Sequence, residues 1–145
     1  MRNKEAARYS LRRAQVILEE AEHLRERSAW NLVVRRCQEA VEVALKGTLL
    51  WAGLSVPRIH DVGGILRQHT GRFPMDFQRV LSRLASISRS LRAEREISFY
   101  GDEESGLPPE ALYVAADADE ALEKARTVLM HVGELVGGDQ PTGEE

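Results

Sequence analysis

The sequence lacks the cysteine pairs of a secreted protein and the long apolar segment of a membrane protein. Its one cysteine, Cys37, has no partner within the chain, so a disulfide framework is excluded. No apolar stretch approaches the ~18 residues that a membrane-spanning helix needs, and no basic start followed by an apolar run marks a secretory leader. We therefore expect a cytoplasmic protein that does not contact a membrane.

Two further absences limit the fold and the ligand. Strand-type alternation of polar and apolar residues is missing, and no glycine-rich phosphate loop follows a strand, which excludes a doubly wound nucleotide-binding fold. The net charge of -3 argues against a general nucleic-acid binder held by bulk electrostatics, but it allows a local basic groove. With 145 residues, of which 43% are apolar, the chain is one domain that can bury a core.

The main feature that is present is the stretch 28–53, in which small and apolar side chains recur every three or four positions. That spacing predicts a long helix buried against several neighbours. Ser28 suits its N-cap and Gly53 the left-handed position after its end. The buried stripe is expected to consist of Ala29, Val33, Cys37, Ala40, Val41, Ala44, Leu45, Thr48 and Ala52.

The remaining chain predicts helices on both sides of this stretch. Their expected ranges are 3–26, 61–68 with Asp61 as its cap, 75–96, and 109–136 with Pro109 in its first turn. Residues 97–108 read as an ordered irregular loop, and residues 138–145 as a disordered tail. The predicted fold is all-α: an antiparallel up-and-down helical bundle over residues 1–137, with four long helices plus one short helix.

The end of the fourth predicted helix is the candidate binding site. It gathers the guanidinium groups of Arg92 and Arg95 with Tyr100 and Asp102 of the following loop. Guanidinium groups hold phosphate, and aromatic rings such as that of Phe99 can stack on a base. The alternative is a solvated basic helix end that interacts favourably with its own dipole and with neighbouring carboxylates.

Two other chemistries have weaker support in the sequence. The pair His60 and Asp61, with His23 upstream and an aspartate in the last helix, loosely resembles the ligand pattern of helical metal-dependent phosphohydrolases. A His-Asp pair arises easily by chance and Asp61 has a capping role, so we expect no metal and no cofactor. Cys37 lies on the apolar stripe, which favours an inert core thiol over a nucleophile.

Three segments in order resemble the HEPN domain family: residues 37–53, 60–66 and 95–103. The family typically shows Q-A-x-E-x-x-x-K in its second helix, H-D-L-x-x-L after the turn, and a basic-to-aromatic stretch at the end of the fourth. Two departures are visible, since Glu39 stands where the glutamine is expected, with Gln38 one position early, and Val62 replaces a leucine. The positions that match are Ala40, Glu42, Lys46, His60, Asp61, Arg95 and Tyr100.

The resemblance implies a helical bundle that usually forms a homodimer, with a cleft between subunits lined by the fourth-helix arginine. It also implies nucleotide or RNA as ligand and, for many members, a minimal nucleotidyltransferase as partner protein. By this analogy the ligand-binding residues are Arg92, Arg95, Tyr100, Asp102, Lys46 and His60, and the catalytic pair would be Arg95 and Tyr100.

Whether the chain is an enzyme is left open by these residues. Ribonucleases of this family use an arginine followed a few residues later by a histidine, and here Tyr100 stands at the matching distance from Arg95. A phenol is a poor general base at neutral pH. The sequence therefore favours binding of nucleotide or RNA without cleavage, and the alternative is a metal-independent ribonuclease toxin of a toxin–antitoxin pair.

Overall fold

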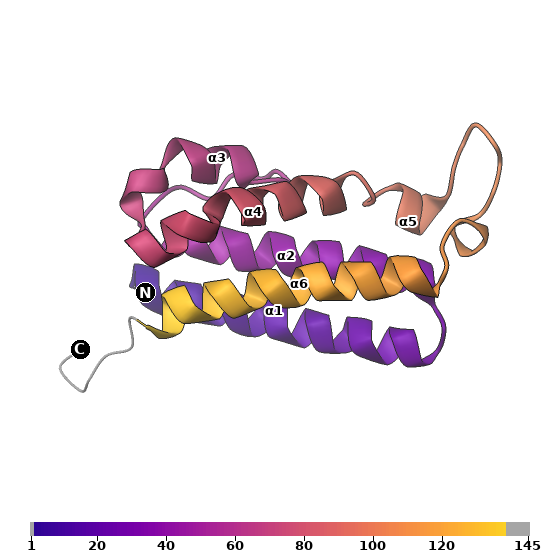
Figure 1. Cartoon of the computed structure of the whole chain (residues 1–145), viewed down its shortest axis with the longest axis horizontal. Coiled ribbons are helices and arrows are strands. Elements are labelled where there is room, and N and C mark those ends of the chain that lie inside the picture. The colour runs from indigo at the N-terminus through magenta and orange to yellow at the C-terminus, as the bar shows by residue number, and fades with distance from the viewer. Residues whose placement is uncertain (1, 139–145) are drawn as a thin grey trace.

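The computed structural model describes residues 2–138 as an all-helical chain (Figure 1). The prediction of a disordered tail falls, apart from Gly138, outside the described residues. Four helices are long: α1 (Asn3–Glu26), α2 (Trp30–Trp51), α4 (Met75–Arg92) and α6 (Ala115–Gly137). The shorter elements are α3 (Gly63–Gln68), η1 (Thr70–Arg72), α5 (Ile97–Tyr100) and η2 (Pro109–Ala111).

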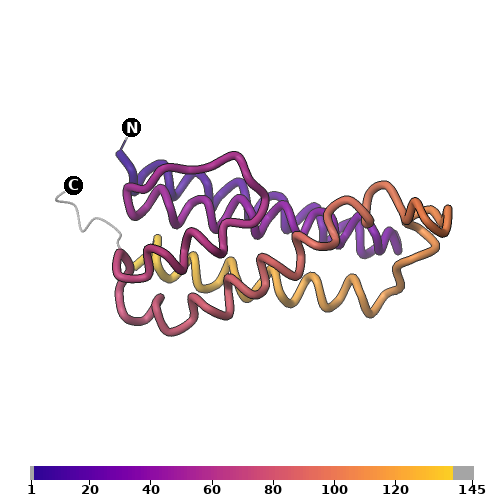
Figure 2. Tube along the Cα trace, turned by 90° about the horizontal axis from the view of Figure 1, so that it is seen from above, coloured from indigo at the N-terminus to yellow at the C-terminus, as the bar shows by residue number. Residues whose placement is uncertain are grey.

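The long helices form the expected up-and-down bundle. Each of them runs antiparallel to the long helix before it, and the start of α1 and the end of α6 lie at the same end of the bundle (Figures 1 and 2). The segment α5 and the loop after it lie at the opposite end. The predicted fold class is therefore confirmed, and no helix within residues 2–138 has the length and apolarity needed to cross a membrane.

Helix α2 lies at the centre of the packing, because α1, α4, α5 and α6 all contact it. The apolar stripe predicted for this helix is buried in its middle part and half-buried at Ala29 and Ala52. Complete burial of a valine or leucine contributes about 1.5–3 kcal/mol, so this stripe is a main source of stability. Its fully buried members are Val33, Cys37, Ala40, Val41, Ala44, Leu45 and Thr48.

The role predicted for Ser28 was wrong. Helix α2 begins at Trp30, and Ser28 has a left-handed φ of 58°. The amides of Ser28 and Ala29 donate to the carbonyls of Arg25 and Leu24, which closes the C-terminus of α1 in a Schellman motif. Ser28 therefore ends the first helix instead of capping the second, and the left-handed residue lets the chain reverse.

The role predicted for Gly53 is confirmed. Its φ is 75°, and its amide donates to the carbonyl of Leu50 while the amide of Leu54 donates to that of Leu49. These are the two hydrogen bonds of a Schellman motif at the end of α2. A residue without Cβ takes this conformation at no steric cost.

Two other boundaries differ from the prediction, and both lie near the candidate site. Helix α4 ends at Arg92 instead of residue 96, and the expected loop contains α5. Pro109 begins the short η2, and α6 starts only at Ala115, because the Asp117 carboxylate accepts from the amide of Val114 and fixes the first turn there.

The short helix α3 lies close against α4. It begins at Gly63 with Val62 at the N-cap position, so Asp61 lies one residue before the position predicted for it. The Asp61 carboxylate still accepts from the amide of Gly63, a free donor of the first turn. A Cβ at Gly63 would come within 3.0 Å of Ala85, so bare backbone is needed for this approach. A Cβ at Gly64 would meet no atom within 4 Å. Gly64 therefore weakens the helix without allowing any close packing in return.

Candidate functional site

One side of α2 carries charged and amide side chains instead of apolar ones. We call this set the polar face of α2: Arg35, Gln38, Glu39, Glu42 and Lys46. Gln38, Glu42 and Lys46 are spaced four residues apart, so their side chains lie on the same side of the helix. Residues from two other segments, His60 and Arg95, complete a polar network on this face.

Glu42 is the acceptor that most of this network shares. Its Oε1 atom accepts from Gln38 Nε2 at 3.1 Å and lies 2.9 Å from His60 Nδ1, and its Oε2 atom accepts from Lys46 Nζ at 2.9 Å. Burial by itself would raise the pKa of Glu42, but the hydrogen bonds from Lys46, Gln38 and His60 outweigh it and lower that pKa. The carboxylate is therefore held in its charged form.

Arg95 reaches this network from the turn between α4 and α5. Its side chain is only 17% exposed, and its Nη1 atom donates to Gln38 Oε1 at 2.6 Å. The same nitrogen lies 3.9 Å from Glu42 Oε1 and 4.0 Å from Glu39 Oε2. Among the described residues, the recorded contacts of this guanidinium use Nη1 alone, so Nε and Nη2 have no protein acceptor there.

Further hydrogen bonds from α2 fix the backbone around Arg95. The carbonyl of Arg95 accepts from Arg35 Nη1 at 2.8 Å, and the carbonyl of Ser98 accepts from the buried Asn31 side chain at 3.1 Å. The Arg35 guanidinium also lies over the Phe99 ring, 5.0 Å from its centroid. Helix α5 is therefore attached to α2 at several points, and Arg95 is held on a rigid support.

The predicted site residues separate into two groups. Arg95, Lys46 and His60 meet around Glu42, as described above. The other three lie apart from this network: Arg92 pairs with Glu96 at 2.7 Å, Tyr100 is 72% exposed, and the Asp102 carboxylate accepts amides of its own loop. No recorded contact within residues 2–138 joins Tyr100 to Arg95; its ring meets the edge of Phe99, with centroids 5.0 Å apart.

Sequence reasoning did not assign a site role to Gln38, Glu42 or Arg35. Glu42 was quoted as a motif residue and Gln38 as a departure from the motif, but neither was expected to contact Arg95. The four-residue spacing of Gln38, Glu42 and Lys46 was a usable signal, since it places polar groups side by side on a helix that is otherwise apolar. The partner of Gln38 lies 57 positions away, and no local pattern reveals that contact.

Metal and thiol chemistry find no support within the described chain. No group of three or more His, Cys, Asp or Glu side chains among residues 2–138 is placed to hold a metal ion. The Asp61 carboxylate instead accepts from Ser88 Oγ at 2.7 Å and from the Gly63 amide. Burial raises the pKa of the Cys37 thiol to about 12, so this residue is not an activated nucleophile.

The charges of this network favour an anion. Three cations (Arg35, Lys46 and Arg95) face two carboxylates (Glu39 and Glu42), which leaves one net positive charge before His60 is counted. His60 is 40% exposed and lies at the edge of the network. A phosphate oxygen could therefore approach a partly buried guanidinium, where a charge-assisted hydrogen bond is stronger than in water.

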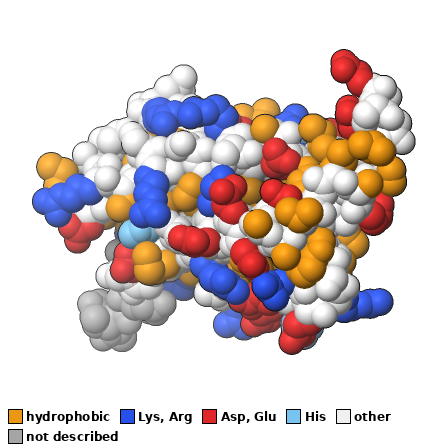
Figure 3. All heavy atoms as spheres, turned by 45° about the vertical axis from the view of Figure 1, so that its right-hand side comes forward, with side chains coloured by type: hydrophobic (Ala, Val, Ile, Leu, Met, Phe, Trp, Pro, Cys, Tyr) orange, Lys and Arg blue, Asp and Glu red, His pale blue; other side chains and the backbone are white. Residues whose placement is uncertain are grey.

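A second surface feature lies beside this site, at the end of the bundle that carries α5. Hydrophobic side chains gather there on the molecular surface (Figure 3). The exposed apolar residues of α5 and the segment after it, which we call the α5 patch, are Ile97, Phe99, Tyr100, Leu107 and Val114. By contrast, Trp30, Trp51 and Leu54 are partly buried and pack against the core of their own chain.

Comparison with known proteins gave one match. The family model described as HEPN domain matches residues 7–135, which is most of the chain and includes all three segments that carry the resemblance. No curated protein and no solved structure matches the chain.

The Glu42 network predicts a pH-dependent stability. Because the pKa of Glu42 is lowered in the folded state, its contribution is present above the unfolded-state pKa and is lost as pH falls through the folded-state pKa. We expect Glu42→Gln to lose about 1–3 kcal/mol of unfolding free energy at neutral pH, because the amide has no negative charge and only one acceptor oxygen for Lys46 and His60. Urea denaturation of the parent and the variant from neutral to acidic pH measures this difference.

The exposed Glu123→Gln is the matched control and should stay within about 0.5 kcal/mol of the parent at every pH. The difference between parent and Glu42→Gln should shrink toward acid pH. A variant as stable as the parent at neutral pH, or equally destabilised at all pH values, would contradict the role of Glu42.

Proposed function

The chain belongs to the HEPN domain family, and on that premise we propose that it binds a nucleotide or RNA by a phosphate group at Arg95 without cleaving it. The observation that carries this proposal is the Arg95 guanidinium itself. It is partly buried and anchored through Nη1 to Gln38, and its Nε and Nη2 atoms have no acceptor among residues 2–138. A planar guanidinium held in this way is suited to bind a phosphate with two parallel hydrogen bonds.

Two further basic side chains support the same site. Lys46 and His60 are both attached to Glu42, the carboxylate that also lies near Arg95. Because Glu42 holds both side chains, they lie on the same face of the bundle as Arg95. A bound phosphate, or the next phosphate of an RNA strand, would therefore contact more than one positively charged group.

A metal-independent ribonuclease is the second candidate, and one contact favours it. Although no histidine follows Arg95 closely in the sequence, His60 lies beside Arg95 through their common neighbour Glu42. Glu42 orients the Nδ1 side of the imidazole, which leaves Nε2 to take the proton of an RNA 2'-hydroxyl while the guanidinium stabilises charge on the phosphate. The attacking oxygen would form a cyclic phosphate and release the 5'-oxygen of the next nucleotide.

We expect Arg95→Gln to weaken binding of labelled RNA at least about tenfold, because one charge-assisted phosphate contact is lost. Fluorescence anisotropy at fixed salt measures the affinity, since phosphate binding depends strongly on ionic strength. Arg89→Gln is the control, since Arg89 is an exposed arginine of the same basic helix and should have only a small effect. An equal loss of RNA affinity in both variants would contradict a site at Arg95, because binding would then depend only on the overall positive charge of the helix.

The same samples distinguish binding from cleavage. Incubation of the protein with labelled tRNA and mRNA, with and without EDTA, should leave the RNA intact. Cleavage that persists in EDTA and disappears in both Arg95→Gln and His60→Gln would replace the binding proposal by the ribonuclease. Tyr100→Phe tests the catalytic pair of Arg95 and Tyr100 that was expected from the sequence. This variant should bind RNA within about twofold of the parent and, like the parent, should leave the RNA intact.

We also propose that two copies of the chain associate through the α5 patch. Exposed apolar side chains next to an anion site fit the shared cleft that the family resemblance implies. Two Arg95 sites would then lie near one another across the interface. A nucleotidyltransferase partner, the other expectation from the resemblance, stays a prediction.

Light scattering tests the dimer directly. The parent should give twice the chain mass of 16.3 kDa, and Tyr100→Glu combined with Leu107→Glu should give a monomer, because two charges would be buried in the interface. Tyr9→Glu combined with Val16→Glu changes two exposed apolar residues of α1 and should leave the dimer intact. A parent of single-chain mass would remove the shared cleft.

A further inference from the structure

The carboxylate of Glu39 lies among three arginine side chains at the Arg95 site. Its Oε2 atom accepts from Arg35 Nε at 3.3 Å and lies 4.0 Å from Arg95 Nη1. Its Oε1 atom accepts from Arg36 Nη1 at 2.8 Å. The Arg35 and Arg95 side chains are both largely buried. Three guanidinium groups therefore already surround one anionic group, and that group belongs to the protein itself.

Glu39 is the carboxylate of this site that a ligand can replace. Its side chain is 24% exposed, and its recorded partners within residues 2–138 are the three arginines alone, so it can turn toward solvent. Glu42 is 13% exposed and accepts from both Gln38 and Lys46, which hold it in place. A phosphate accepts the same parallel hydrogen bonds from guanidinium groups as a carboxylate does, so it suits the position of Glu39.

The burial of Arg95 limits which kind of phosphate can take that position. An internal phosphate of an RNA strand carries a sugar on each side, so it must bring both sugars up to a guanidinium that lies largely below the surface. A terminal phosphate carries a sugar on one side only. It has three free acceptor oxygens and a charge of about −1.5 to −2 at neutral pH, as other phosphate monoesters have. It can therefore enter between the arginines and brings more charge than the carboxylate that it replaces.

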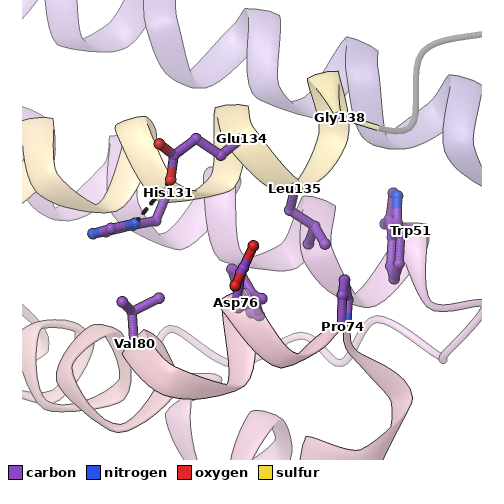
Figure 4. Close-up of a pocket in the computed structure, with 9 residues that line it drawn as sticks. Trp51, Pro74, Asp76, Val80, His131, Glu134, Leu135 and Gly138 are labelled. Atoms are coloured by element: carbon purple, nitrogen blue, oxygen red, sulfur yellow. Dashed lines mark hydrogen bonds and ion pairs between the residues drawn. The ribbon is translucent and has the colours of Figure 1, made fainter.

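The cavity at the other end of the bundle does not compete for such a group. It has a volume of about 510 Å³ and lies between the end of α2, the start of α4 and the end of α6 (Figure 4). Asp76 and Glu134 line it, and its histidine, His131, lies 3.2 Å from Glu134 Oε1 (Figure 4). No lysine or arginine is among the described residues of this lining. Its charge disfavours a phosphate, whereas the charge around Arg95 favours one.

On the basis of the binding function proposed above, we propose that the Arg95 site selects the terminal phosphate of a nucleotide or RNA strand over internal phosphodiesters. Glu39 occupies the site in the free protein and turns outward when the phosphate binds. The phosphate then accepts from Nε and Nη2 of Arg95 and from the guanidinium groups that Glu39 releases. Glu39 contributes to the selection, because a phosphodiester with one negative charge gains little by replacing a carboxylate of equal charge.

Fluorescence anisotropy with two RNA strands labelled at the 3' end tests the selection. One strand carries a 5'-phosphate. The other ends in a 5'-hydroxyl and is one nucleotide longer, so that both contain the same number of phosphates. The parent should bind the 5'-phosphate strand at least about fivefold more tightly, and Arg95→Gln should abolish this preference.

Equal affinity of the parent for the two strands would overturn the selection of a terminal phosphate. If Arg95→Gln then weakened binding of both strands, the Arg95 site would remain a site for RNA. If it weakened neither, the proposed function would fail together with the selection.

Glu39→Gln tests the part played by the carboxylate. This variant should bind the 5'-phosphate strand at least about threefold more tightly than the parent, because the neutral amide competes less for the arginines. Glu20→Gln is the matched control: Glu20 lies 3.7 Å from Arg36 Nε and has no recorded contact with Arg35 or Arg95 in the described chain. Its affinity should stay within about twofold of the parent. Weaker binding by Glu39→Gln, or a gain no larger than that of Glu20→Gln, would contradict the role of Glu39.

Discussion

Gln38 is an amide that the fold buries almost completely, with 2% of its surface exposed, and it must find partners for both its oxygen and its nitrogen. The oxygen accepts from Arg95 and the nitrogen donates to Glu42. This one side chain therefore joins a guanidinium from the α4–α5 turn to the carboxylate that organises Lys46 and His60. The cost of leaving any of these groups unpaired keeps the set together, and the candidate site depends on that constraint.

The rest of the bundle makes this arrangement rigid. Helix α2 is buried on its apolar stripe against α1 and α6, so its polar face has a fixed direction. The break after Arg92 turns the chain so that Arg95 points back to α2, and the contacts of Arg35 and Asn31 with the α5 backbone hold it there. An uninterrupted fourth helix would have been simpler, but the turn allows the guanidinium to enter a partly buried site.

The long helices, their order and the stripe of α2 could be predicted from the sequence, because side-chain periodicity reflects burial directly. The boundaries at Ser28, Arg92 and Ala115 could not, since each is set by local hydrogen bonds of a turn, which the periodicity of apolar side chains does not reveal. For the site, Arg95 was proposed from the basic end of the fourth helix, and Lys46 and His60 were added only through the family resemblance. The structure brings these three residues together around Glu42. Tyr100 and Arg92 share the same short segment as Arg95 but face elsewhere, because the turn after α4 changes the direction of successive side chains. The role of Gln38 could not be predicted, because it depends on a hydrogen bond to Arg95, which is 57 positions away in the chain.

The central claim is that Gln38 holds Arg95 in place, and a double-mutant cycle measures this contact most directly. Gln38→Met and Arg95→Met remove the hydrogen bond from either side with little change in volume, and urea denaturation of the parent, both single variants and the double variant gives the coupling free energy. The account predicts a favourable coupling of about 1.5–3 kcal/mol, the range for a hydrogen bond to a charged group. A coupling of about zero, with the two substitutions simply additive, would contradict it.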